Sequence, residues 1–290
     1  MSETRPRELR RPARPHLPWA KAVRTAALAV LVAFMLFPLL WMLSTSFKIE
    51  KDVFAFPIQW IPPHVTLDNY KDVWTVTQEF NFPLYYLNSI KVTVAVVVLQ
   101  LVISAMAAYA FAKMRVRAGG ALFAAFLATM MIPDQVTVIP RFLLVSRLGL
   151  LDTHAGLILM AAFSVYGVFL LRQSMIALPD SLIEAAKIDG AGHWRVFTRI
   201  VLPLSKPTLA TLAILRFVWT WNDYQNPLIF LNTPAKFTLQ LAMSYFSDAN
   251  GTLYALLMAA SVSAVVPLLI VFLVGQRYVI EGMAAGAVKG

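Results

Sequence analysis

Six long, charge-poor apolar stretches dominate this sequence. A helix that crosses about 30 Å of hydrocarbon needs roughly 20 apolar residues at 1.5 Å of rise each. The chain has 290 residues, of which 59% are hydrophobic and 14% charged, against about 25% charged in ordinary soluble domains. The stretches cover residues 25–46, 88–112, 118–140, 154–171, 208–231 and 254–275. We therefore predict an all-α polytopic membrane protein with six transmembrane helices.

The charges between these spans differ from one side to the other. Six spans place both termini on the same side, together with the loops 113–117 and 172–207. That side holds 17 Lys and Arg against 6 Asp and Glu, and the opposite side holds 7 against 8. Because Lys and Arg concentrate in cytoplasmic segments, we predict a multi-pass protein of the cell membrane with cytoplasmic N- and C-termini.

The same pattern predicts how the chain is organised. We expect a basic cytoplasmic arm (1–24), a transmembrane domain (25–281) with a cytoplasmic loop (179–207), and a cytoplasmic tail (282–290). The arm contains RPRELRRPARP, whose charge is also typical of nucleic-acid-binding arms. Next to a first membrane span, topology and contact with anionic lipid explain it better, so we expect membrane lipid and no nucleic acid as a partner.

The sequence contains no pattern typical of an enzyme. It has no cysteine, which excludes thiol catalysis, disulfides and thiolate metal sites, and its four histidines do not have metal-ligand spacing. Hydrolase and phosphate-loop motifs are also absent from the sequence. We expect no catalytic residue, no metal site and no cofactor in this chain.

The largest predicted outer loop, 47–87, is rich in aromatic residues and prolines. Part of this composition is typical of an interfacial aromatic belt. Exposed aromatic residues also favour protein partners, so a docking surface for an external protein is the other interpretation.

The stretch EAAKIDGAGHWRVFTRIVLP, residues 184–203, interrupts the apolar sequence. Ser181 and Glu184 have the spacing of a capping box, and Gly190 is the residue type that ends a helix in the left-handed conformation. We predict a helix over 181–189 and a second that ends at Pro203. Its apolar face is expected to hold Trp194, Phe197 and Val201, with Arg195 and Arg199 on another. A helix–turn–helix elbow of this kind suits a groove in another protein.

The elbow sequence resembles the signature loop of the membrane subunits of bacterial ABC importers. The pattern is E-A-A, three residues, G, nine residues, I-x-L-P. The segments WTWNDYQNPLIF (219–230) and GMAAGAVKG (282–290) are further similar to the carbohydrate-uptake permeases of the maltose-system type, the MalG-like subunits. The likeness extends over nearly the whole chain after the arm, with Met283 and Ala284 in place of the usual Leu and Thr.

The resemblance implies the type I ABC importer (MetI-like) permease fold and a set of partners. These are a homologous second permease (MalF-like), an ATPase dimer that carries ATP and Mg, and an extracytoplasmic substrate-binding protein. The elbow would be the coupling helix seated in the ATPase, with the tail as a further contact. The implied coupling residues are Glu184, Ala185, Ala186, Asp189, Gly190, Ile200, Leu202 and Pro203, and the implied tail contacts are Gly286, Lys289 and Gly290. A capping role for Glu184 is the alternative.

The fifth predicted span carries an unusual group of polar side chains. On a continuous helix, Arg216, Trp219, Thr220, Asp223 and Asn226 share one stripe, and Asn222 lies beside it. Ionisable residues inside a membrane usually face a cavity or a partner, and Arg216 and Asp223 are too far apart to pair directly. We predict that these six residues line a carbohydrate path. A packing network between helices is the alternative, and Trp219 suits either a sugar-stacking or a core role.

Two other functions remain open. A stand-alone secondary transporter or channel would work without ATP and is expected to show internal inverted repeats, which we do not find in the sequence. The permease of a non-sugar ABC importer would share the elbow. The predicted function is a carbohydrate importer's permease subunit, which leaves ATP hydrolysis to a partner.

Overall fold

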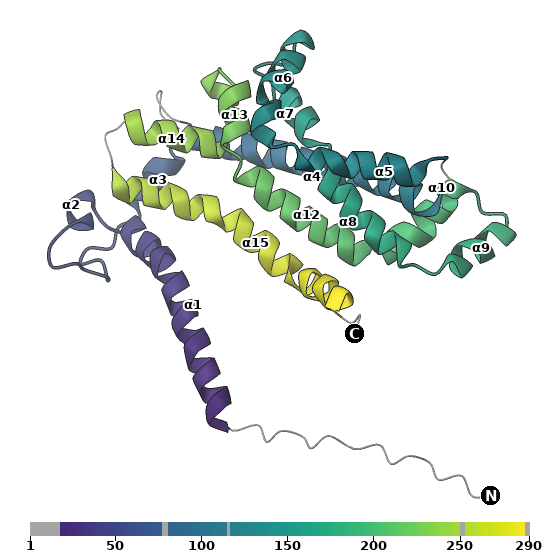
Figure 1. Ribbon diagram of the computed structural model, residues 1–290. Helices are drawn as coiled ribbons and strands as arrows, with labels where there is room; N and C mark the ends of the chain where they lie inside the picture. The colour runs from purple at the N-terminus through teal and green to yellow at the C-terminus, as the bar shows by residue number, and fades with distance from the viewer. Residues whose placement is uncertain (1–17, 77–80, 115–116, 250–252, 288–290) are drawn as a thin grey trace, which may run out of the picture.

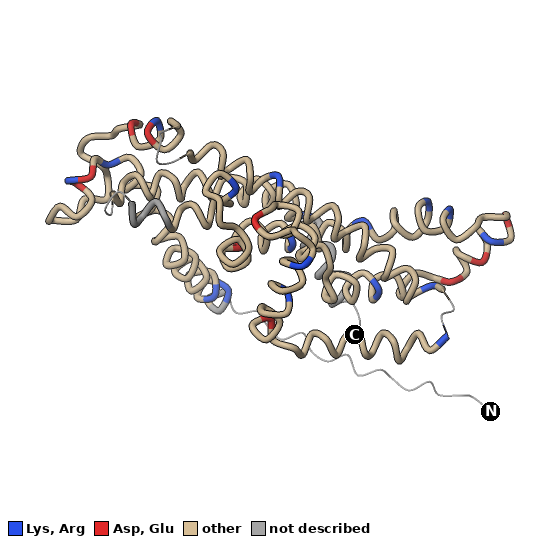
Figure 2. Tube along the Cα trace, turned by 90° about the horizontal axis from the view of Figure 1, so that it is seen from above, with Lys and Arg blue, Asp and Glu red and all other residues tan. Residues whose placement is uncertain are grey.

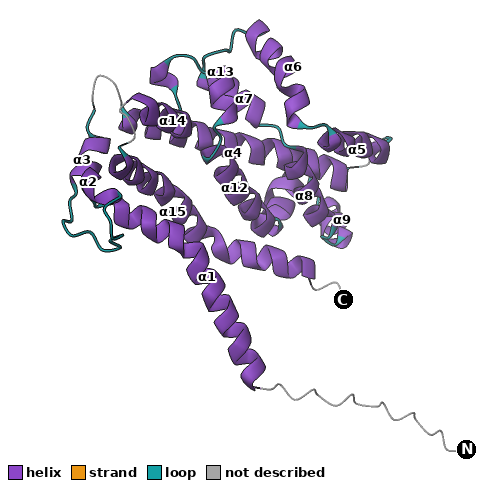
Figure 3. Ribbon diagram, turned by 60° about the vertical axis from the view of Figure 1, so that its left-hand side comes forward, coloured by secondary structure: helices purple, strands orange, loops and turns teal. Residues whose placement is uncertain are grey.

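The computed structural model describes residues 18–76, 81–114, 117–249 and 253–287. These residues form helices joined by loops, without a strand among them (Figure 3). Three helices are long and apolar enough to cross a membrane, and there are six such spans if each of three bent helix pairs counts as one. The long helices are α1 (Pro18–Ser46), α4 (Phe82–Lys113) and α15 (Tyr254–Ala287). The predicted all-helical membrane fold is therefore confirmed.

Two of the three bent pairs break inside a predicted span, and the third bends where the predicted elbow meets the fifth predicted span. The first pair is α5 (Gly119–Ala128) with η1 (Thr129–Met131), followed by α6 (Asp134–Arg147) at 101°. The second pair, at 42°, is α7 (His154–Ala161) and α8 (Val165–Ile176). The third, at 74°, joins α10 (His193–Val196), η2 (Phe197–Val201) and α11 (Leu202–Leu204) to α12 (Lys206–Trp221).

Proline explains the sharpest of these breaks. Pro133 precedes α6 and holds Ile132 in an extended conformation, with ψ of 116°, because the residue before a proline is disfavoured in the helical region. The span predicted at 118–140 is therefore two helices that meet at a sharp bend. The span predicted at 154–171 is likewise two helices that meet at residues 162–164.

The remaining helices are short and lie mostly at the two ends of the bundle. They are α2 (Glu50–Val53), α3 (Asp68–Trp74), α9 (Asp180–Ile188), α13 (Gln225–Phe230), η3 (Pro234–Lys236) and α14 (Leu239–Ala249). Figure 1 shows α9 and α10 at one end, called the elbow end below, and α2, α3 and α14 at the opposite end. Figure 2 shows charged residues at both ends of the bundle, with a further group between the ends.

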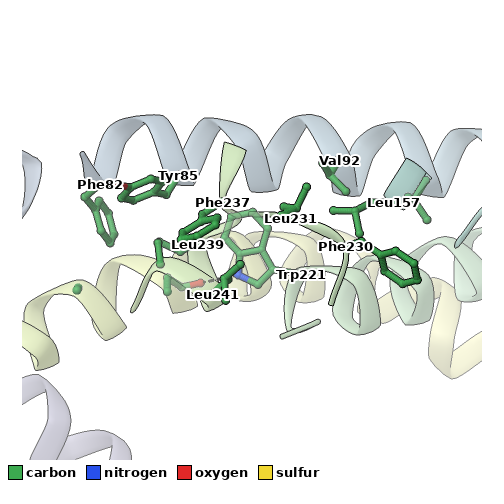
Figure 4. Packing of buried hydrophobic residues seen from close by; sticks show 14 of the residues in the cluster. Phe82, Tyr85, Val92, Leu157, Trp221, Phe230, Leu231, Phe237, Leu239 and Leu241 are labelled. Carbon is green, nitrogen blue, oxygen red and sulfur yellow. Dashed lines mark hydrogen bonds between the residues drawn. The ribbon is translucent and has the colours of Figure 1, made fainter. Parts of the chain in front are cut away.

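Two hydrophobic clusters hold the bundle together. The first surrounds Trp221 and joins α4, α12, α14 and α15 (Figure 4). The Trp221 indole donates to the carbonyl of Ala264 at 3.0 Å, and the small residues Ala259 and Ala260 allow α15 to approach closely. The second cluster packs the elbow helices against α4 and α8. By contrast, none of the most apolar 18-residue window of α1 is buried against the rest of the chain.

Candidate functional site

Helix α9 of the elbow starts one residue earlier than predicted. Pro179 is its N-cap, and no side chain caps the helix. Ser181 therefore lies inside the first turn, where its hydroxyl cannot act as the N-cap, and the predicted capping box is wrong. Asp180 now occupies the first turn, which favours an acidic side chain electrostatically.

A buried lysine attaches the start of α9 to the bundle. The ammonium of Lys113, at the end of α4, donates to Asp180 Oδ1 at 2.6 Å and to the carbonyl of Leu178 at 2.8 Å. The Lys113 side chain is only 4% exposed. Its hydrogen bond and charge hold the pKa of the Asp180 carboxyl below the usual value. Movement of α9 is thereby tied to α4 as well as to its chain neighbours α8 and α10.

Gly190 ends α9 in the predicted conformation. Its φ is +78°, in the left-handed region, and the turn is closed by two backbone bonds. Gly190 N–H donates to Lys187 at 3.0 Å, and Ala191 N–H donates to Ala186 at 2.9 Å. The second bond spans five residues, as in a Schellman motif. The predicted left-handed glycine between the elbow helices is therefore confirmed.

The second elbow helix is anchored in the core, although its buried face differs from the prediction. Val196, Phe197 and Val201 are buried, whereas Trp194 is 66% exposed. Two of the three residues predicted for the apolar face are therefore buried, and the ring of Trp194 packs against Phe197 with centroids 5.6 Å apart at the exposed start of the helix. The helix continues past Pro203 to Leu204, and Ile200 and Leu202 are half-buried.

Helix α9 and the turn that follows it carry five of the eight predicted coupling residues. Glu184, Ala185 and Asp189 are exposed, and Ala186 is half-buried. Ile188 is 87% exposed, which is unusual for an isoleucine. Glu184 has no side-chain partner among the described residues, so its proposed capping role has no support in the geometry. Of the predicted tail contacts, Gly286 lies in α15, whereas Lys289 and Gly290 lie outside the described residues.

A cavity of about 650 Å³ lies between the helices of the bundle. It is lined by residues of α4, η1, α6, α7, α8, α12 and α13. Residues from three helix interruptions, 132–133, 162–164 and 222–224, contribute to its wall. Irregular backbone at membrane depth is tolerated where it lines a cavity or is buried in protein, so the interruptions and the cavity belong together.

Five of the six residues predicted for the path line this cavity: Arg216, Trp219, Thr220, Asp223 and Asn226. Asn222 does not; it is exposed, and its amide donates back to the carbonyl of Val218 at 2.8 Å. The predicted continuous span 208–231 is wrong, because α12 ends at Trp221 and α13 begins at Gln225. The Asp223 carboxylate helps to start the new helix by accepting from Asn226 N–H at 3.1 Å and from its side-chain amide at 2.7 Å.

Arg216 forms a hydrogen bond that stabilises the interruption between α7 and α8. Its Nη2 donates to the carbonyl of Ala161, the last residue of α7, at 2.7 Å. This carbonyl lies where the regular helix stops, so a side-chain donor satisfies a group that the helix leaves open. Arg216 and Asp223 were predicted not to pair directly, and their side chains indeed have these other partners.

Four buried polar atoms at the cavity have no hydrogen-bond partner among the described residues. They are Arg141 Nε, Arg216 Nε, Thr220 Oγ1 and Thr238 Oγ1. Native proteins pair nearly all buried polar groups, so this cluster of donors suits a ligand rich in oxygen acceptors. Beside them the Trp219 ring, 49% exposed, meets Tyr166 edge to face at 5.7 Å. An aromatic face and several donors are the elements that bind a sugar ring.

The sequence did not predict Arg141, Tyr166 or Thr238. Arg141 directly follows the predicted span 118–140 and so falls outside the predicted membrane segments, and its position in the charge-poor segment after Pro133 is the one available signal. Thr238 reaches the cavity because Asp152 holds the preceding loop. The Asp152 carboxylate accepts hydrogen bonds from the backbone N–H groups of Asn232 and Thr233 at 2.9 and 3.0 Å and from Lys236 Nζ at 2.8 Å. Hydrogen bonds from Lys236, Thr233 and Asn232 hold the pKa of Asp152 well below its usual value.

Comparison with known proteins identifies relatives along almost the whole chain. Residues 100–284 match the family described as the binding-protein-dependent transport system inner membrane component. The chain is 34% identical over 284 residues to the arabinooligosaccharides transport system permease protein AraQ of Halalkalibacterium halodurans, covering 97% of this chain and 100% of that one. It is 34% identical over 268 residues to the melibiose/raffinose/stachyose import permease protein MelC of Bacillus subtilis, covering 91% and 95%.

A solved structure shares the fold. It is a chain of a bacterial ABC transporter involved in the import of the acidic polysaccharide alginate. The two chains superpose with a TM-score of 0.81 at 26% identity, over 91% of this chain and 99% of the other.

Proposed function

The chain belongs to the family of binding-protein-dependent transport system inner membrane components, and on that premise we propose how it works. It is the permease subunit of an ABC importer for a carbohydrate, and it is not itself an enzyme. Its central cavity forms part of the substrate path, and its elbow transmits movement from a separate ATPase. The relatives AraQ and MelC, named for arabinooligosaccharides and for melibiose, raffinose and stachyose, support the substrate class.

The observation that carries this proposal is the meeting of three helix interruptions at a cavity with unpaired polar atoms. Transporter sites commonly form near the bilayer midplane from discontinuous helices. A sugar in the cavity would accept hydrogen bonds from the guanidinium of Arg216 and the hydroxyl of Thr220, and would stack on Trp219. Each unpaired polar group in a dry site costs several kcal/mol, so these groups favour a solute that supplies partners.

The alternative for the polar stripe, a packing network between helices, explains the cavity less well. A packing network would pair its own donors and acceptors. Arg216 has one such bond, to Ala161, yet its Nε and the hydroxyl of Thr220 have none among the described residues. These two unpaired groups, Arg216 Nε and the Thr220 hydroxyl, are the ones that would form hydrogen bonds with a transported solute.

The partners follow from the importer architecture. We propose a second, homologous permease, an ATPase dimer with its ATP and Mg at the elbow end, and an external binding protein at the opposite end. The apolar surface of α1, which no other part of the described chain covers, supports the proposal that lipid and a partner subunit cover it in the assembled importer. The excess of Lys and Arg in the elbow and the N-terminal arm supports a cytoplasmic orientation for both.

Single cysteines test whether the stripe faces an aqueous path, because the chain has no cysteine of its own. Cysteines at 219, 220, 223 and 226 are expected to react with a small water-soluble thiol reagent in the assembled importer. Cysteines at 217, 218, 221 and 228, which do not line the cavity, should react about tenfold less, since they lack water. Reactivity at the first four should change when the ATPase is trapped with nucleotide.

The matched pair is Thr220→Cys and Val218→Cys, two residues apart on the same helix. Equal protection of all eight cysteines would show that the stripe is packed against other helices. The substrate path would then belong mainly to the second permease.

Replacement of Glu184 by glutamine tests the elbow. The change preserves the side-chain shape and removes its charge, and Glu184 has no partner in this chain to lose. We expect retention of the ATPase on detergent-solubilised permease to fall about threefold to tenfold, as a charge-assisted contact between subunits would predict. Thermal unfolding of the permease should not change. Full retention of the ATPase together with a lowered unfolding temperature would instead assign Glu184 to helix stability.

A further inference from the structure

The loop between α2 and α3 exposes apolar side chains that the proposed transport path does not use. Residues 54–67 contain no Lys, Arg, Asp or Glu. Their exposed apolar side chains include Phe56 at 95%, Ile58 at 63% and Ile61 at 84%. Contiguous apolar groups of this kind on a protein surface usually mark a site of interaction with protein or membrane.

Hydrogen bonds from the end of α1 hold this loop in place. The ammonium of Lys48, which is fully buried, donates to the carbonyl of Gln59 at 2.6 Å. The hydroxyl of Ser44 donates to the carbonyl of Trp60, and Thr66 N–H donates to Phe47 at 3.0 Å. The loop is therefore fixed at its middle and near its end, with its apolar side chains held outward.

Aromatic contacts set the height of the loop along α1. The Trp60 ring packs against Phe37 and Trp41, with ring centroids 4.7 and 5.3 Å apart. Phe37 lies nine residues before the end of α1 at Ser46, which is about 13 Å along the axis at 1.5 Å per residue. The loop thus folds back beside the last two turns of a membrane-spanning helix, and Figure 1 shows it next to that end of α1.

We propose that residues 54–61 are an interfacial membrane anchor. They insert Phe56, Ile58 and Ile61 into the boundary between headgroups and acyl chains of the leaflet opposite the elbow end. The loop continues the exposed apolar surface of α1, whose Phe37 and Leu40 are 54% and 56% exposed, so the lipid that covers part of α1 also reaches the loop. Tryptophan is enriched at this depth of the bilayer, where Trp60 lies, and apolar side chains enter this layer when a polar backbone remains near the headgroups.

Fluorescence quenching by lipid tests the anchor in the assembled importer. A single cysteine replaces Phe56, Ile58 or Ile61 and is labelled with the environment-sensitive dye NBD. Each labelled importer is then reconstituted in phosphatidylcholine vesicles whose acyl chains either are or are not brominated near the headgroup. We expect brominated lipid to quench all three dyes at least about twofold more than a dye at Asp72→Cys. Asp72 is exposed on α3 at the same end of the bundle. A dye at Leu40→Cys on α1 is the lipid-facing reference.

Two results would overturn the proposal. Quenching by aqueous iodide equal to that at Asp72→Cys, with no effect of brominated lipid, would place the loop in water. A blue-shifted dye that resists both quenchers would show that a protein, such as the external binding protein, covers the loop. Because Phe56 and Ile61 are almost fully exposed, the substitutions remove no core contact, and three positions guard against one misfolded variant. The test does not depend on whether the central cavity carries substrate.

Discussion

Replacing Gly190 by valine is expected to leave the chain inserted in the membrane and to abolish substrate-stimulated ATP hydrolysis by the assembled importer. Gly190 has φ of +78°. An L-residue in the left-handed region costs about 1–2 kcal/mol, and a β-branched one costs more because its side chain meets the backbone. Since about 1.4 kcal/mol corresponds to a factor of ten, the native turn would be populated at least about tenfold less.

The strain acts on coupling because the two elbow helices are anchored differently. The second helix is buried in the core through Val196 and Val201, and α9 is attached at its start by Lys113. The turn at Gly190 therefore sets the direction of α9 relative to the bundle. If α9 is the contact with the ATPase, a changed turn misplaces that contact without loosening the core.

Gly192 provides the matched control for this variant. It lies two residues away with φ of −69° and ψ of 165°, a conformation that valine adopts easily. A Cβ added at either glycine meets no atom within 4 Å, so crowding does not distinguish the two positions. Gly192→Val and Gly190→Asn, whose asparagine tolerates the left-handed region, should keep stimulated ATPase activity near wild type. Normal stimulation in Gly190→Val would reject the coupling role of the turn.

The features predicted correctly from sequence depend on local chemistry. The three long spans α1, α4 and α15 follow from composition and length alone. Gly190 is identified by the rule that a left-handed helix end favours glycine. The capping box failed for an equally local reason, because Pro179 is the N-cap and α9 starts at Asp180, one residue before Ser181.

The helix interruptions were harder to predict, because only one carries a strong local signal. Pro133 marks the first. Residues 162–164, with sequence AFS, contain neither proline nor glycine, and the break there is stabilised by Arg216, which comes from α12 and satisfies Ala161. A contact between segments 55 residues apart cannot be seen in the periodicity of either one.

The same reason explains the incomplete prediction of the cavity. The helical wheel of the fifth span grouped Arg216, Trp219 and Thr220 correctly, since these three lie on α12. Arg141 and Thr238 come from other segments, and Thr238 is positioned through the hydrogen bonds of Asp152 to the preceding loop. Tertiary hydrogen bonds of this kind have no signature in a single sequence.

Replacing Arg216 should separate its structural role from its transport role. Arg216→Met removes the donor to the Ala161 carbonyl, and a buried carbonyl left open costs about 1–3 kcal/mol. We therefore expect this variant both to lower the unfolding temperature of the permease and to abolish transport.

Arg216→Lys retains one donor that can reach Ala161, but it lacks the planar fork that presents Nε to the cavity at the same time. Its unfolding temperature should stay near wild type, whereas uptake by the reconstituted importer of the sugar delivered by its binding protein should fall about tenfold to 100-fold. That range corresponds to a lost hydrogen bond from a charged group, about 1.5–3 kcal/mol. Asn222→Ala, whose side chain bonds only to Val218 outside the cavity, should transport normally. If Arg216→Lys also transports normally, Arg216 acts only to hold the interruption between α7 and α8, and the unpaired Nε does not bind the substrate.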